Sequence, residues 1–94
     1  MNNYEALYIL RADLGDEATE AQIAKYAKAV TDAGGEVEKT DKWGVKKLAY
    51  QIDFKTEGYY VLMTFTAPGT LPLELERQMK ISEEVIRYLV IRKE

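Results

Sequence analysis

YYVLMTFTA, residues Tyr59–Ala67, decides the fold, because aromatic and β-branched side chains fill most of its positions. Such side chains suit the pleated, half-buried surface of a sheet, so the segment predicts a strand. Pro68-Gly69 ends this strand, since proline cannot donate to a strand ladder. Before it, Lys55–Gly58 predicts a hairpin turn, and Val37–Ile52 predicts a long partner strand that is bent or bulged around Gly44.

Two shorter apolar runs predict the first and last strands of the chain: Tyr4–Leu10, which is typical of a central strand, and Val85–Ile91. A helix is expected to precede the last strand and to begin near Pro72, because proline is well tolerated in the first turn of a helix. Its buried side is predicted to consist of Leu71, Leu75 and Met79.

Another helix is predicted after the first strand, from Glu17 to about Ala33. Its apolar residues recur at helical spacing and form one stripe, made of Ile23, Tyr26, Ala27 and Val30. Asp16 is the expected N-cap, and Gly34-Gly35 ends the helix, since glycine adopts the left-handed cap conformation without a Cβ clash.

The resulting order is β-α-β-β-α-β, which predicts an α+β fold of the ferredoxin-like type. We expect residues 1–94 to form a single domain, with a four-stranded antiparallel sheet in the order 4-1-3-2 and both helices on one face. The other face of the sheet would then have no helical cover.

A sheet face without helical cover is normally polar, but here apolar residues occur on both faces of the strands. We assign one alternating set to the core: Ala6, Tyr8, Val61, Met63, Phe65, Tyr88 and Val90. The other set would lie on the open side beside Arg87: Leu7, Ile9, Tyr60, Leu62, Leu89 and Ile91. A contiguous apolar patch of this kind marks a partner-binding surface, although a loop or self-association would also cover it.

Composition argues against most catalytic functions. The chain has no cysteine and no histidine, which removes thiolate zinc sites, disulfides and the commonest general base. We predict a non-enzymatic protein without a metal or cofactor. The amino terminus lacks a signal-peptide pattern, and no apolar run approaches the roughly 20 residues of a membrane helix, so we expect a cytoplasmic protein.

Charge is unevenly distributed, although the net charge is only −3. Residues 1–36 hold three basic and seven acidic residues, a balance of −4, and residues 37–94 hold ten basic and nine acidic, a balance of +1. A local basic surface can therefore bind phosphates on an acidic protein.

Two other functions are known for this topology. An RNA-recognition motif would need a basic-aromatic recognition strand, but Tyr59–Ala67 contains no Lys or Arg. An acylphosphatase-like hydrolase would need a phosphate-cradling loop after the first strand. Arg11 is present there, but Ala12–Asp16 is acidic rather than a glycine-rich anion site. Trp43 fits core or edge packing better than base stacking.

Five segments together resemble the bacterial ribosomal protein S-six family over essentially the whole chain. They are Tyr4-Glu5, Gly34-Gly35, Trp43–Ile52 with the sequence WGVKKLAYQI, Gly58–Tyr60, and Arg87–Val90. The most specific pattern is Gly-x-basic-basic-Leu-Ala-Tyr-x-Ile, at Gly44–Ile52.

The resemblance implies a structural ribosomal protein in the cytoplasm. It would bind the central domain of 16S ribosomal RNA as a heterodimer with ribosomal protein S-eighteen, which would cover the open face. Positions matching basic sites of the family are Lys46, Lys47, Lys80, Arg87 and Arg92. The alternative is a ferredoxin-like regulatory domain that binds a metabolite and self-associates through its sheet.

Overall fold

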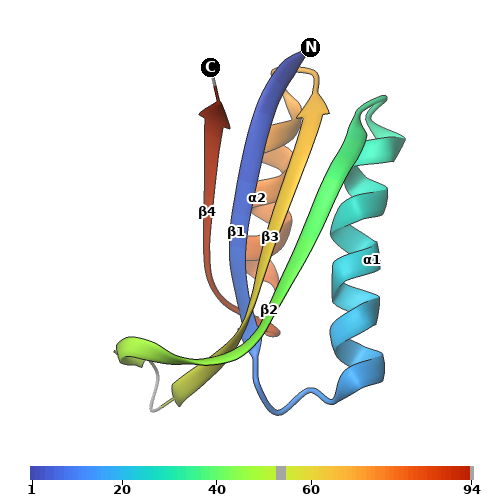
Figure 1. Ribbon diagram of the computed structural model, residues 1–94. Helices are drawn as coiled ribbons and strands as arrows, with labels where there is room; N and C mark the ends of the chain where they lie inside the picture. The colour runs from blue at the N-terminus through green and yellow to red at the C-terminus, as the bar shows by residue number, and fades with distance from the viewer. Residues whose placement is uncertain (53–54, 94) are drawn as a thin grey trace.

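The computed structural model describes residues 1–52 and 55–93 and contains six elements (Figure 1). They are β1 (Asn2–Arg11), α1 (Asp16–Asp32), β2 (Glu36–Ile52), β3 (Lys55–Ala67), α2 (Leu71–Ile81) and β4 (Val85–Lys93).

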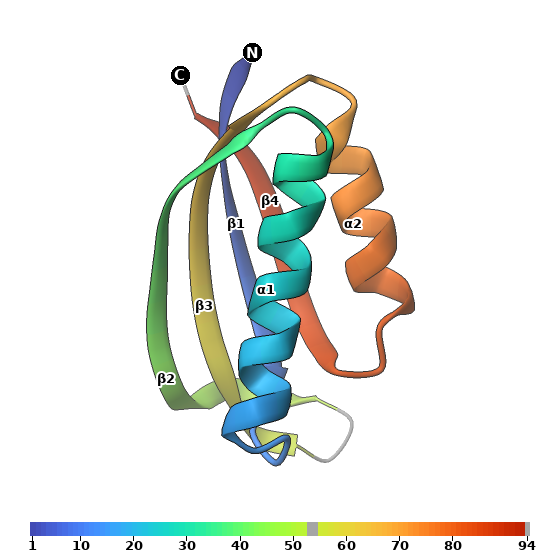
Figure 2. The ribbon, with the colours of Figure 1, turned by 90° about the vertical axis from the view of Figure 1, so that its right-hand side faces the viewer.

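The strands form one antiparallel sheet in the order β2-β3-β1-β4, which confirms the predicted topology. Both helices pack on the same face of the sheet, as Figure 2 shows, where α1 and α2 lie together on one side of the strands. The opposite face, toward the viewer in Figure 1, carries no helix. This two-layer arrangement leaves half of the sheet's side chains available for contacts outside the fold.

The core lies between the sheet and the helices, where the predicted set of residues points. Ala6, Tyr8, Val61, Met63 and Phe65 are buried, and Tyr88 and Val90 pack against them from the edge strand. The helices contribute Ile23, Tyr26, Val30, Leu71, Leu75 and Met79. At the centre, the rings of Tyr8 and Tyr26 meet edge to face with centroids 5.2 Å apart.

Two glycines end α1 and let the chain enter the sheet. Gly34 has a φ of 87°, and its N–H donates to the carbonyl of Thr31 while the N–H of Gly35 donates to that of Val30. These are the two bonds of a Schellman cap, as the Gly-Gly pair predicts. A Cβ on Gly35 would clash with the carbonyl oxygen of Thr66, so the cap also sets how closely α1 approaches β3.

The predicted N-cap of α1 is wrong. Asp16 is the first helical residue, and Gly15 occupies the cap position without a side-chain cap. The carbonyl of Gly15 instead accepts hydrogen bonds from both the N–H and the hydroxyl of Thr19, at 3.0 and 2.7 Å. The helix therefore starts one residue earlier than an aspartate cap would allow.

β2 is bulged where the sequence predicts it. Lys42 pairs with Val61 and Gly44 with Tyr60, so Trp43 is an extra residue on β2. Gly44 has a φ of 82°, a conformation that glycine adopts without strain. Beyond this bulge, β2 and β3 continue together past the end of β1.

The predicted turn at Lys55–Gly58 is wrong, because these residues belong to β3. Lys55 pairs with Ile52, and Gly58 pairs with both Lys46 and Arg11. Residues 53–54, between Ile52 and Lys55, lie outside the described part of the chain. We call residues 45–52 and 55–57 the hairpin arm; Figure 1 shows it leaving the lower end of the sheet and curling toward the uncovered face.

Candidate functional site: the open face of the sheet

The face of the sheet opposite the helices, called here the open face, is organised in rows across the strands. The register places Leu89, Leu7 and Leu62 in one row. The next row toward the arm contains Arg87, Ile9 and Tyr60. On the other side lie Ile91, Glu5 and Thr64. The middle of the face is thus apolar.

All six residues predicted to contact a partner share this face, but they differ in exposure. Leu89 and Ile91 on the edge strand are 57% and 47% exposed, whereas Leu7, Tyr60 and Leu62 are half-buried. Ile9 is buried, because it packs against Gly58, where Leu48 of the hairpin arm also approaches. The arm therefore supplies a partial cover at one end.

A hollow of about 280 Å³ lies in the centre of the open face. We call it the central hollow; it is lined by Leu7, Ile9, Tyr60, Arg87, Tyr88 and Leu89. Four of the six residues predicted to contact a partner thus surround one concavity, together with the basic residue predicted beside them.

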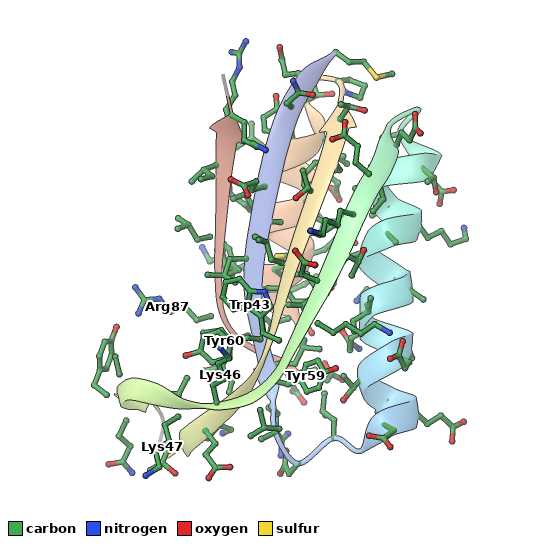
Figure 3. All side chains as sticks on the ribbon, viewed as in Figure 1. Trp43, Lys46, Lys47, Tyr59, Tyr60 and Arg87 are labelled. Carbon is green, nitrogen blue, oxygen red and sulfur yellow. The ribbon has the colours of Figure 1, made fainter. Side chains whose placement is uncertain are left out.

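Trp43, for which the sequence analysis favours core or edge packing, forms an aromatic wall on the open face. Its ring stacks on Tyr60 with centroids 6.4 Å apart and planes inclined by 14°, and the side chain remains 44% exposed. The Nζ atom of Lys46 lies 5.3 Å from the centre of the Trp43 ring. Figure 3 shows these three side chains together on the open face, with Tyr59 directed toward α1. The bulge at Gly44, visible in the sequence, is the signal that could have placed Trp43 here.

Tyr50 is a residue that the sequence interpretation did not single out. Its hydroxyl accepts a hydrogen bond from Nη1 of Arg87, and the guanidinium carbon lies 5.8 Å from the ring centre. Tyr50 comes from the arm and Arg87 from β4, so the contact spans the open face. No local sequence pattern reveals it, because 37 residues separate the pair.

The five predicted RNA-binding residues do not form one cluster. Lys46 and Arg87 both lie at the aromatic end of the open face. Lys47 follows Lys46 on β2 and so points to the other side of the arm. Lys80 is on α2 in the helical layer, and Arg92, near the far end of β4, donates to the Asn2 side chain at 2.9 Å.

Ion pairs occupy several other basic residues. Lys42 binds Glu20 of α1 at 2.7 Å, a hydrogen bond that raises the pKa of Lys42. Arg77 pairs with Glu74 within α2. Within residues 1–52 and 55–93, neither Lys46 nor Arg87 forms an ion pair, so both charges are available to an anionic ligand.

The described residues contain no group of three or more Asp, Glu, His or Cys side chains placed to hold a metal ion. Neither of the two described helices has the length and apolar character needed to cross a membrane.

Comparison with known proteins gives the same family from sequence and from structure. A family model described as "Ribosomal protein S6" matches residues 3–92. The "Small ribosomal subunit protein bS6" of Moorella thermoacetica is 47% identical over 94 residues, covering 100% of this chain and 96% of the relative. The protein of the same name from Alkaliphilus metalliredigens is 48% identical over 92 residues, covering 98% and 97%.

The crystal structure of 30S ribosomal protein S6 from Thermotoga maritima superposes with a TM-score of 0.92 at 27% identity, covering 98% of this chain and 87% of that one. The chain therefore belongs to the ribosomal protein S6 family, whose members are structural, non-enzymatic components of the small ribosomal subunit, and it is located on the ribosome in the cytoplasm.

Proposed function

We propose that this chain binds the central domain of 16S ribosomal RNA together with ribosomal protein S-eighteen, with which it forms a heterodimer. The observation that carries the proposal is the open face, where six apolar side chains adjoin the cations of Lys46 and Arg87. An apolar patch on this scale favours a protein partner. Cations at its border would neutralise phosphates.

The two ligands would use different parts of the face. S-eighteen would cover the apolar rows, whose residues are Leu7, Ile9, Tyr60, Leu62, Leu89 and Ile91. RNA would contact Lys46 and Lys47 at the arm, and also Arg87, which lies between the arm and the apolar rows and so adjoins both ligands. Lys80 and Arg92 lie away from this end, so they would be contacted only by RNA that extends along the molecule.

The distribution of charge supports the proposal that RNA binding needs the protein partner. The acidic side chains Asp16, Glu17, Glu20 and Asp32 belong to α1, on the far side of the sheet from the open face. The net charge of −3 nevertheless weakens attraction for RNA at long range. A protein with this net negative charge should bind RNA weakly alone, and a heterodimer can add the basic surface of its partner.

A metabolite-binding function is less well supported by the geometry. Small-molecule sites usually enclose roughly 300–1,000 Å³ and bury most of the ligand. The central hollow measures about 280 Å³, at the lower end of this range, and it opens on the sheet face, so it would leave part of a ligand exposed.

The test is binding to a central-domain fragment of 16S ribosomal RNA, with and without S-eighteen, from low to high salt. We expect tight binding only when S-eighteen is present, and a logarithmic salt slope of about −0.9 for each phosphate neutralised in helical regions. Equimolar S-eighteen should also co-elute with the chain in gel filtration. Absence of RNA binding at low salt with S-eighteen present would refute the proposal.

A further inference from the structure

The central hollow has the architecture of a socket. Ile9 is 7% exposed and forms its floor with half-buried Leu7, both from the central strand β1. Tyr60 forms one wall and is itself held by the stacked Trp43. Leu89, 57% exposed, forms the opposite rim on β4. A buried floor between raised walls can enclose an inserted group.

The hollow has room for one large side chain. It measures about 280 Å³, which is at the lower end of the roughly 300–1,000 Å³ of small-molecule sites. Protein interfaces commonly concentrate their binding energy where one large side chain fills a desolvated pocket near the centre of the contact. The central hollow lies in the middle rows of the open face, where such an anchor would be expected.

The rim chemistry favours an aromatic anchor. Arg87 lines the hollow, and its guanidinium is held by the hydroxyl of Tyr50. A fixed guanidinium can stack on an inserted ring, and Tyr60 can contact the ring from the other side. The floor offers only the aliphatic side chains of Leu7 and Ile9.

We propose that the central hollow is a socket for a single large, aromatic side chain of the protein partner. The inference rests on the proposed heterodimer and adds the chemistry of the contact that anchors it. A nucleobase is a poorer occupant, because its hydrogen-bonding edge would lie against the aliphatic floor. A second copy of this chain is a poorer occupant, since the exposed aromatic side chains of its described part, Trp43 and Tyr50, already contact its own Tyr60 and Arg87.

The socket can be filled from within by Leu7→Phe. Leu73→Phe is the matched control, because Leu73 is 76% exposed on α2 in the helical layer and does not line the hollow. We expect Leu7→Phe to raise the Kd for S-eighteen by about 30-fold, as loss of one hot spot would. Leu73→Phe should raise it by less than about 3-fold. Leu89→Trp, at the exposed rim, fills the hollow without altering the central strand and serves if Leu7→Phe is poorly folded.

An alanine scan of the aromatic residues of S-eighteen then identifies the anchor. One alanine variant should lose about 30-fold in affinity for the wild-type chain and little for the Leu7→Phe chain, since the socket is already filled. If folded Leu7→Phe and Leu89→Trp bind S-eighteen as tightly as wild type, the socket is refuted while the heterodimer stands. Weakened RNA binding with unchanged S-eighteen binding would also refute it, in favour of a base. Failure of the wild-type chain to bind S-eighteen would refute both proposals.

Discussion

Arg87 of β4 donates a hydrogen bond to the hydroxyl of Tyr50, which lies 37 residues earlier on the hairpin arm. The guanidinium carbon lies 5.8 Å from the centre of the Tyr50 ring, so the side chain has both a polar and a cation–π contact. This pair fixes the cation at the border of the apolar face. It also fastens the arm, which otherwise projects beyond β1, to the opposite edge of the sheet.

The Tyr50 contact should matter for binding more than for stability. Tyr50→Ala removes both interactions with Arg87, and we expect RNA affinity in the presence of S-eighteen to fall about 5-fold, because about 1 kcal/mol of preorganisation is removed. Tyr50→Phe keeps the ring and should weaken binding less. Isothermal titration of both variants measures the difference. Gln51→Ala, at the exposed neighbouring position, is the control, and an equal effect there would show that the arm as a whole is responsible.

Leu89→Asp should disrupt association with S-eighteen and leave the chain folded. A charge at this half-exposed position would have to be buried in the interface, at a cost of several kcal/mol, whereas surface substitutions usually change folding stability by about 0.5 kcal/mol or less. Gel filtration with S-eighteen and thermal unfolding measure the two effects. Leu73→Asp is the matched control, because Leu73 is 76% exposed on α2 in the other layer.

Equal weakening by Leu73→Asp would place the partner on the helical layer instead. Loss of the native fold in Leu89→Asp would contradict the assignment of Leu89 to an uncovered face.

Removal of two lysines should change the salt dependence of RNA binding. Lys46→Ala combined with Lys47→Ala should reduce the logarithmic salt slope by about one unit for each phosphate that these lysines neutralise in the wild-type chain. Lys28→Ala is the control, since Lys28 lies on α1 and pairs with Asp32 at 2.9 Å. Single substitutions test the geometry further, because Lys46 and Lys47 point to opposite sides of the arm. An unchanged slope in the double variant would exclude both residues from the RNA interface.

Periodicity predicts most of the fold because the alternation of apolar residues is strong in β1, β3 and β4. The same alternation correctly divides core from open face, since Val61 and Met63 are buried and Leu62 between them is not. What fails is local detail. Gly15 rather than Asp16 is at the cap position of α1, and Lys55–Gly58 belongs to β3, although a glycine after three polar residues suggests a turn.

The candidate site is less predictable than the fold, because its contacts join distant residues. Strand alternation places Leu7, Tyr60 and Leu89 on one face. It cannot show that Trp43 turns onto Tyr60 at a bulge, or that the arm brings Tyr50 to Arg87. The positions of the basic residues are harder still to predict. Lys80 and Arg92 carry the same charge as Lys46, but they lie on other parts of the molecule.

Tyr8 gives the chain a specific sensitivity to alkaline pH. Its side chain is fully buried, its hydroxyl has no hydrogen-bond partner among the described residues, and burial raises its pKa well above the usual value, with a smaller contribution from Tyr26. In the unfolded chain the phenol ionises near its ordinary pKa of about 10. Above that pH the unfolded state loses a proton that the folded state keeps. This stabilising contribution is therefore fully present below about pH 10 and is lost as the pH rises further.

Tyr8→Phe should remove this sensitivity while preserving the core, since it deletes only the unpartnered hydroxyl. At pH 7 we expect a free energy of unfolding within about 1 kcal/mol of wild type. Above pH 10 the stability of wild type should fall more steeply than that of the variant, by up to about 1.4 kcal/mol per pH unit. Burial also raises the pKa of Tyr26, so the variant should keep part of the slope. Urea unfolding between pH 7 and pH 11.5 measures both curves, and parallel curves would mean that Tyr8 ionises equally easily in the folded and unfolded states.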